Sequence, residues 1–170
     1  ARPAPTRAAM PGPVVLVPVP SSAAARRARG GDVTAALARA AARDLRARQP
    51  SVERALYLLF NEGHHGSRED NPLHPAMCAD ALRFAELLLG AVGIEPRSVH
   101  ALAALFCFNA ARLDTRLDAD GVFVPLAEQD RARWDPSLVD RGVAHLGAST
   151  GGDTWTRWHL EAGIALEHTI

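Results

Sequence analysis

Apolar residues recur every three or four positions along most of the chain after residue 50. One such stripe consists of Met77, Ala81, Phe84, Ala85, Leu88 and Val92, and a second consists of Val99, Leu102, Ala103, Phe106, Cys107 and Ala110. This spacing is typical of α-helices with one buried face. The predicted helices cover residues 32–48, 52–61, 73–92, 96–113, 136–146 and 154–170.

Residues that favour helix ends set the boundaries of these elements. Asp32, Ser51 and Asp153 are predicted N-caps, because their side chains can accept hydrogen bonds from the first free N–H groups of a helix. We expect Pro50-Ser51 to separate the first two helices, and Gly63 to end the second in a left-handed conformation.

The fourth and fifth predicted helices differ in character from the others. The helix over 96–113 is apolar on most of its sides, since Leu105 and Phe108 lie opposite its main stripe, and such a helix is expected at the centre of a domain. The fifth begins at Asp135-Pro136, a strong combination of N-cap and first-turn residue.

Residues 114–127 interrupt the helical pattern. Asp118-Ala119-Asp120-Gly121 predicts a turn, and residues 122–126 are extended in type and can pair with residues 115–117 in a short hairpin. The loops elsewhere are short, which favours antiparallel helix pairs. The sequence therefore predicts an all-α fold of antiparallel helical hairpins with one short non-helical insert near 114–127.

Composition separates the start of the chain from the rest. Residues 1–31 are rich in Pro, Ala and Arg, which predicts a disordered arm before a helical domain over 32–170. The net charge is zero, but residues 1–50 carry nine arginines against only two acids, Asp32 and Asp44. We interpret this as a solvated basic arm; nucleic-acid binding remains an alternative, although no aromatic residue lies among Arg26, Arg27 and Arg29.

The sequence also indicates a compartment. Cys78 and Cys107 are the only cysteines, both in apolar helical surroundings, and are expected to be buried reduced thiols. No apolar run approaches the roughly 20 residues that span a membrane. Both observations favour a cytoplasmic protein without a membrane partner.

Glu62, His64 and His65 are the first candidate metal or catalytic residues, with His74 as a possible third ligand. A zinc-protease helix carries its two histidines four residues apart on one face, whereas these two are adjacent and follow Gly63. We therefore favour a structural role, in which Asn61 and Glu62 finish a helix and anchor the next connector.

Acidic residues in the insert are a second candidate. Asp114, Asp118 and Asp120 before Gly121 suggest a calcium loop, but with Gly121 as its sixth residue position one would be Arg116. A charged turn is the better interpretation. A further interpretation is an ion-pair network that ties the insert to the helices. It would join Arg112, Arg116, Arg131 and Arg133 to Asp114, Asp118, Glu128 and Asp130.

No pattern for covalent catalysis or phosphate binding is present in the sequence. None of the serines or cysteines lies in a nucleophile elbow or a Cys/His pattern, and the glycines at 147–152 lack the lysine of a P-loop. We expect no enzymatic activity and no cofactor.

Several motifs in order resemble a known family. They are ALYLLFNEGHHGS, CADALRFAELLL, ALAALFCFNAARLDTRLDADGVFVPLAEQDRARWD and TWTRWHLEAGIALEH. Together they resemble the C-terminal extension of a group of extracytoplasmic-function (ECF) sigma factors of the sigma-70 family, over about Leu45 to Ile170. That extension follows the regions that bind RNA polymerase and the promoter, and it leads into TPR-like repeats.

The resemblance implies a TPR-like α-α superhelix and a non-catalytic interaction or regulatory role in bacterial transcription initiation. It implies a protein partner, either the sigma factor's N-terminal part or RNA polymerase, and DNA contact only through regions absent from this chain. The family often has an aromatic residue where His64 stands, which favours packing there. The implied structural or interaction residues are Asn61, Glu62, Gly63, Arg112, Asp118, Asp120, Gly121, Gln129, Asp130, Arg131, Trp134, His159 and Glu161.

Two alternatives remain open from the sequence. One is a small metal-binding protein or enzyme that uses Glu62, His64, His65 and Asp120. The other is the product of a truncated gene with no role of its own.

Overall fold

The computed structural model describes residues 33–65 and 73–169, so the predicted disordered arm over 1–31 lies outside the described residues. Five α-helices form in the described part: α2 (Val33–His64), α3 (Pro75–Leu89), α4 (Pro96–Ala110), α5 (Pro136–Ser149) and α6 (Arg157–Glu167). These ranges contain no β-strand beyond a single isolated bridge. The prediction of an all-α fold is confirmed.

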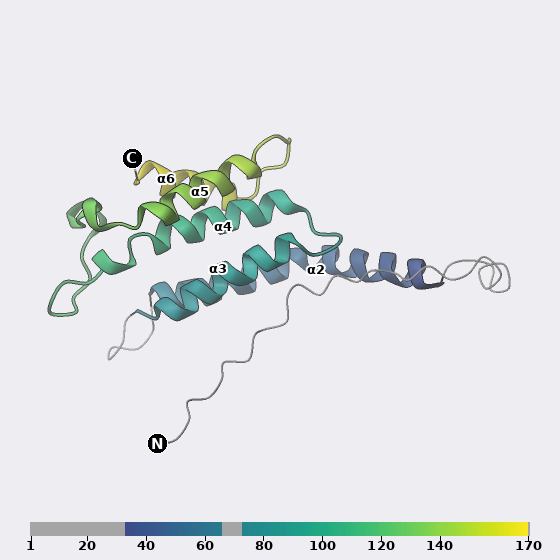
Figure 1. Cartoon of the computed structure of the whole chain (residues 1–170), viewed down its shortest axis with the longest axis horizontal. Helices are drawn as coiled ribbons and strands as arrows, with labels where there is room; N and C mark the ends of the chain where they lie inside the picture. The colour runs from purple at the N-terminus through teal and green to yellow at the C-terminus, as the bar shows by residue number, and fades with distance from the viewer. Residues whose placement is uncertain (1–32, 66–72, 170) are drawn as a thin grey trace, which may run out of the picture.

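Helix α4 is the centre of the molecule. It packs against α2, α3, α5 and α6, and it lies between α3 and α5 in Figure 1. Every residue from Ser98 to Phe108 except His100 is buried. The prediction from its two apolar faces is therefore confirmed, and the alanines at 101, 103 and 104 let neighbouring helices approach closely.

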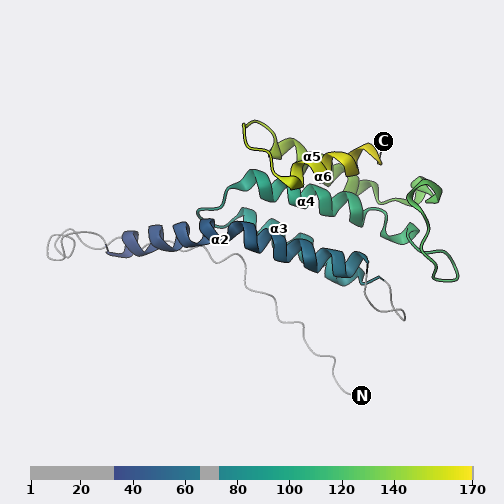
Figure 2. The ribbon, with the colours of Figure 1, turned by 180° about the vertical axis from the view of Figure 1, so that it is seen from behind.

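Helix α2 runs without interruption through Pro50, so the predicted break at Pro50-Ser51 is wrong (Figure 2). A proline inside a helix costs about 3 kcal/mol, because it removes a hydrogen bond and crowds the preceding turn. The residues beside it, Gln49 and Glu53, make buried hydrogen bonds with residues of α4 and α6. These tertiary contacts hold both sides of the helix in register and offset that cost.

Gly63 is helical and buried, and it does not adopt the left-handed conformation that the sequence suggested. A Cβ atom at this position would lie 2.8 Å from Cys78 Sγ, 2.9 Å from Cys78 N and 2.9 Å from His74 O. The backbone at the start of α3 therefore approaches Gly63 directly. Glycine is needed here for close packing of α2 against α3, and the helix ends one residue later.

The predicted start is correct for α5 and wrong for α6. Asp135 caps α5 as predicted, since its carboxylate accepts from Ser137 N and Leu138 N. Helix α6 begins at Arg157 and not after Asp153, because Thr156 and His159 form a capping box there. The prediction that Asp153 caps this helix is therefore wrong, because Thr156 and His159 cap it instead.

The insert between α4 and α5 consists of three short 3-10 helices, η1 (Leu113–Thr115), η2 (Leu126–Glu128) and η3 (Arg131–Arg133). A single antiparallel bridge joins Leu117 and Phe123, as the hairpin pattern predicted. Asp118 Oδ1 accepts from the backbone N–H groups of Asp120 and Val122, and Gly121 has a φ of 79°. The predicted Asp118–Gly121 turn is therefore confirmed.

In the ranges that the structure covers, no helix combines the length and the apolar character needed to cross a membrane.

Candidate functional site

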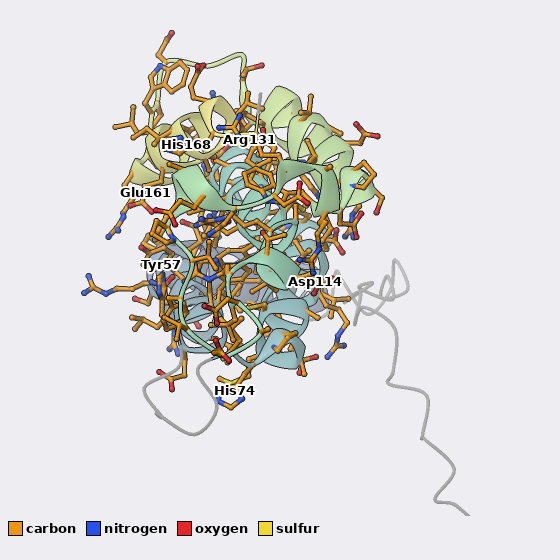
Figure 3. All side chains as sticks on the ribbon, turned by 90° about the vertical axis from the view of Figure 1, so that its left-hand side faces the viewer. Tyr57, His74, Asp114, Arg131, Glu161 and His168 are labelled. Atoms are coloured by element: carbon orange, nitrogen blue, oxygen red, sulfur yellow. The ribbon has the colours of Figure 1, made fainter. Side chains whose placement is uncertain are left out.

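Four basic side chains gather where α2 and α4 end beside the insert. We call His64, His65, Arg112 and Arg116 the histidine–arginine cluster. Figure 3 looks along the helices from this end, with Tyr57 and Glu161 on one side, Asp114 on the other and His74 at the lower edge. The continuous helix α2 delivers the histidines, and the irregular chain after α4 delivers the arginines.

His64 is the buried member of the cluster. It is 2% exposed, its ring stacks on Phe60 with the centroids 5.6 Å apart, and its Nε2 has no hydrogen-bond partner among the described residues. Burial, reinforced by the positive charges of Arg116 and Arg112, lowers the pKa of His64 to about 2. His64 is therefore a neutral, packed imidazole at physiological pH.

His65 lies at the surface and bonds to the insert. Arg116 Nη2 lies 3.1 Å from His65 Nδ1, and because arginine only donates, Nδ1 is the acceptor. Burial and the two arginines lower the pKa of His65, which keeps the ring neutral with its proton on Nε2. His65 therefore offers a donor at Nε2.

Arg116 is buried and Arg112 is half-buried. Arg112 Nη2 donates to Asn109 Oδ1 at 2.8 Å, and Arg116 packs over the Phe123 ring with its Cζ 5.3 Å from the centroid. Burial, together with repulsion from Arg112, lowers the pKa of Arg116 to about 10. Both side chains remain cationic at neutral pH.

Within residues 33–65 and 73–169, Arg112, Arg116 and Arg133 form no ion pair, so the expected ion-pair network does not include these three arginines. Arg133 donates to the backbone carbonyl of Asp114 at 3.2 Å and not to a carboxylate. The cluster thus carries two positive charges, and no carboxylate of the described residues is in direct contact with them.

The residues proposed for metal binding do not converge. Glu62 is exposed on α2, Asp120 lies in the exposed turn of the insert, and His64 is enclosed. Over residues 33–65 and 73–169 no group of three His, Cys, Asp or Glu side chains is placed to hold a metal ion.

The remaining family-motif residues in the insert serve its local structure. Gln129 is buried and donates from Nε2 to Val124 O at 2.9 Å. Asp130 caps η3, and the Arg131 guanidinium lies 5.8 Å from the centre of the buried Trp134 ring. These contacts all lie within the insert and stabilise its irregular conformation.

The motif residues in α6 fix its first turns. His159 is buried, completes the capping box with Thr156, and places Nε2 3.3 Å from Ser149 O. Glu161 accepts two hydrogen bonds from Arg157, at 3.0 and 2.7 Å. His159 therefore joins the start of α6 to the end of α5, whereas the Glu161–Arg157 contact lies within α6.

Sequence reasoning missed a buried carboxylate. Glu53 is 4% exposed, and it accepts from Gln49 Nε2 at 2.8 Å, Ser98 Oγ at 2.6 Å and Trp158 Nε1 at 2.8 Å. These hydrogen bonds join α2, α4 and α6, and a cavity of about 420 Å³ lies beside them. Gln49 and Glu53 are four residues apart, so they share one face of a helix that continues through Pro50. Because the sequence predicted a helix break at Pro50, this pairing was not recognised.

The two cysteines are buried and free, as expected. Burial raises the pKa of Cys78 to about 11 and that of Cys107 to about 12. Both remain thiols at neutral pH, so neither is an activated nucleophile.

Comparison with known proteins places the chain in a family. Residues 48–150 match the family of unknown function DUF6596, and the chain belongs to it. It is 30% identical over 121 residues to an uncharacterized protein of Rhizobium meliloti (strain 1021), and this match covers 71% of the chain and 28% of the relative. The chain therefore spans little more than a quarter of that relative. No solved structure matches.

Proposed function

We propose that this member of DUF6596 is a non-catalytic helical interaction domain of an ECF-type sigma factor, and that it acts in bacterial transcription initiation. The observation that carries the proposal is the ordered set of motifs from Asn61-Glu62-Gly63 through Trp134 to Glu161, which resembles the C-terminal extension of those factors. Such a protein works in the cytoplasm, and contact with DNA would come from its other regions.

The size of the relative supports a domain within a larger protein. The matched region makes up 28% of the Rhizobium meliloti protein, which leaves ample chain there for further regions. The positions of the motif residues also support a binding role, since Gly63, Gln129 and His159 maintain the packing of helices. A domain whose distinctive residues maintain its shape is suited to presenting a surface.

The proposed binding surface is the outer face of α6. Leu160 and Ile164 lie one turn apart, and they are 63% and 61% exposed. Neighbouring apolar side chains on one helical face are a common way to bind a protein partner. We assign this face to the polymerase- and promoter-binding part of the same sigma factor, because the resemblance places that part in the same protein.

Titration of the purified chain with that sigma part, supplied as a separate polypeptide, tests the assignment. We expect saturable binding, and Leu160→Arg should weaken it at least about tenfold, because an arginine cannot be buried in an apolar contact without about 1.4 kcal/mol or more of loss. The matched control is Val92→Arg, which alters an apolar residue beyond the end of α3 that is 56% exposed. Equal binding by the two variants would contradict the assignment of the binding surface to α6. If the unaltered chain does not bind, the sigma part is not the partner.

A further inference from the structure

We propose that the cavity beside the histidine–arginine cluster binds a small oxyanion, either a phosphate or a carboxylate. The cavity measures about 150 Å³ and lies between the C-terminal ends of α2 and α4. Asn61, His65, Asn109 and Arg112 contribute its polar lining, and Phe60 and Phe106 are among its apolar walls. This inference does not depend on the proposed role in transcription.

The charge of the site is the first argument. Arg112 and Arg116 stand four residues apart, and repulsion between them helps lower the pKa of Arg116. Neither is in an ion pair with a described carboxylate. A buried charge is costly unless it is paired, so the buried Arg116 and the half-buried Arg112 together favour an anion nearby, and Arg112 is the one that lines the cavity.

Nearby negative groups compensate only part of this charge. The C-termini of α2 and α4 each present a partial charge of about −0.5, which leaves roughly one positive charge unbalanced. Glu161 also lines the cavity, but its Oε1 already accepts both hydrogen bonds from Arg157. The histidines add no charge, because burial and the arginines lower the pKa of each.

The hydrogen-bonding groups of the cavity are the second argument. The Arg112 guanidinium uses Nη2 for Asn109 and retains further N–H groups. His65 carries its proton on Nε2, because Nδ1 faces the Arg116 donor. With the amide of Asn61, these groups form a set of donors that matches an acceptor-rich ligand, and arginine is the side chain best suited to carboxylate and phosphate oxygens.

The cavity is large enough for a small group. Its volume of about 150 Å³ holds more than a single water molecule, so it has room for a group the size of phosphate or acetate. His65 is exposed at its edge, which gives such an anion a route from solvent.

Calorimetric titration of the chain with inorganic phosphate and, separately, with acetate tests the proposal, with ionic strength held constant by sodium chloride. We expect saturable binding of at least one anion, and the one that binds at lower concentration identifies the class. Arg112→Gln should weaken binding at least tenfold. It should also leave the protein as stable in anion-free buffer, because it removes a repulsive charge.

The matched control is Arg133→Gln, which changes an exposed arginine of the same insert and should leave binding unchanged. If Arg112→Gln does not fold, His65→Ala removes an exposed donor and should weaken binding severalfold. Phosphate and acetate effects no larger than those of chloride would mean that the cavity holds only water, and would overturn the proposal. Equal loss in Arg112→Gln and Arg133→Gln would overturn it as well.

Discussion

Glu53 is one of the residues through which α6 contacts α2. Its carboxylate accepts three hydrogen bonds, from Gln49, Ser98 and Trp158, and these come from three different helices. A buried carboxylate is stable only when its oxygens are satisfied, so each donor contributes more than an exposed hydrogen bond would. The packing of the last helix therefore depends on a polar contact as well as on apolar burial.

Trp158→Phe isolates that contact, because phenylalanine keeps most of the buried ring but lacks Nε1. We expect the free energy of unfolding to fall by about 1–3 kcal/mol, since Glu53 Oε2 loses its donor. Trp155→Phe is the control, as Trp155 is 66% exposed and the change should stay within about 0.5 kcal/mol. Urea unfolding measures both, and equal effects would contradict a role for the Glu53–Trp158 bond.

His64 makes stability depend on pH. Burial, then Arg116 and Arg112, lower its pKa from 6.5 to about 2, so the unfolded chain binds a proton that the folded chain does not. Stability from this residue is complete above pH 6.5 and is lost as the pH falls, by up to about 1.4 kcal/mol per pH unit. His64→Phe should therefore flatten the fall in stability between pH 6.5 and pH 5, measured by chemical unfolding.

The result that would contradict this prediction is a pH dependence that His64→Phe leaves unchanged. If the unaltered chain and His64→Phe lose stability in parallel over that pH range, the imidazole of His64 is not held neutral by the fold. The resemblance to a family with an aromatic residue at this position makes phenylalanine a conservative replacement.

At the scale of elements, the contact between α2 and α3 depends on the missing side chain of Gly63. Gly63→Ala would place a methyl group within 2.9 Å of two backbone atoms of the α3 start, which cannot move as freely as a side chain end. We expect a loss of about 1–3 kcal/mol from overpacking. Thermal unfolding of the purified variant measures it.

Gly163→Ala is the control for helix propensity. Nothing lies within 4 Å of a Cβ atom there, and the residue is inside α6, so the alanine should raise stability by roughly 0.5–1 kcal/mol. A gain at both glycines would show that Gly63 is not a point of close approach.

Sequence patterns predicted those elements whose ends depend on local residues. Asp135-Pro136 starts α5 and the two apolar faces of α4 place it centrally, because both signals act within one turn or one helix. The predictions made from Pro50, Gly63 and Asp153 were wrong, because contacts with residues outside the local pattern act at these positions. Contacts from α3, α4 and α6, and the cap from His159, decide the conformation there, and no local pattern contains them.

In the candidate site too, local features were predicted and contacts between distant segments were not. The motif predicted that Asn61-Glu62-Gly63 is a structural joint, and Gly63 does pack at a joint, although inside a helix. The contact of His64 and His65 with Arg112 and Arg116 was not predicted. It requires the end of α2 to lie against the insert, and His65 and Arg116 are 51 residues apart in the sequence. The sequence instead suggested that these arginines pair with acidic residues of the insert.

At the scale of the whole molecule, stability is distributed around α4. Its buried residues form the core together with side chains from α2, α3 and α6, whereas the first turns of α2 are mostly exposed (Figures 1 and 2). We expect amide hydrogens of Ala101 to Phe108 to exchange slowest and those near residues 35–41 to exchange fastest, because local opening is cheapest where few apolar contacts form. Hydrogen exchange with mass spectrometry measures this order, and uniform protection along α2 would contradict it.

The central claim is that this chain is part of an ECF-type sigma factor. Run-off transcription tests it most directly, with the native full-length protein that carries this region and RNA polymerase core enzyme from the same organism. The account predicts promoter-dependent transcripts only when both are present, and altered initiation when residues 45–170 are removed. A native protein that neither binds core enzyme nor supports initiation would contradict the account.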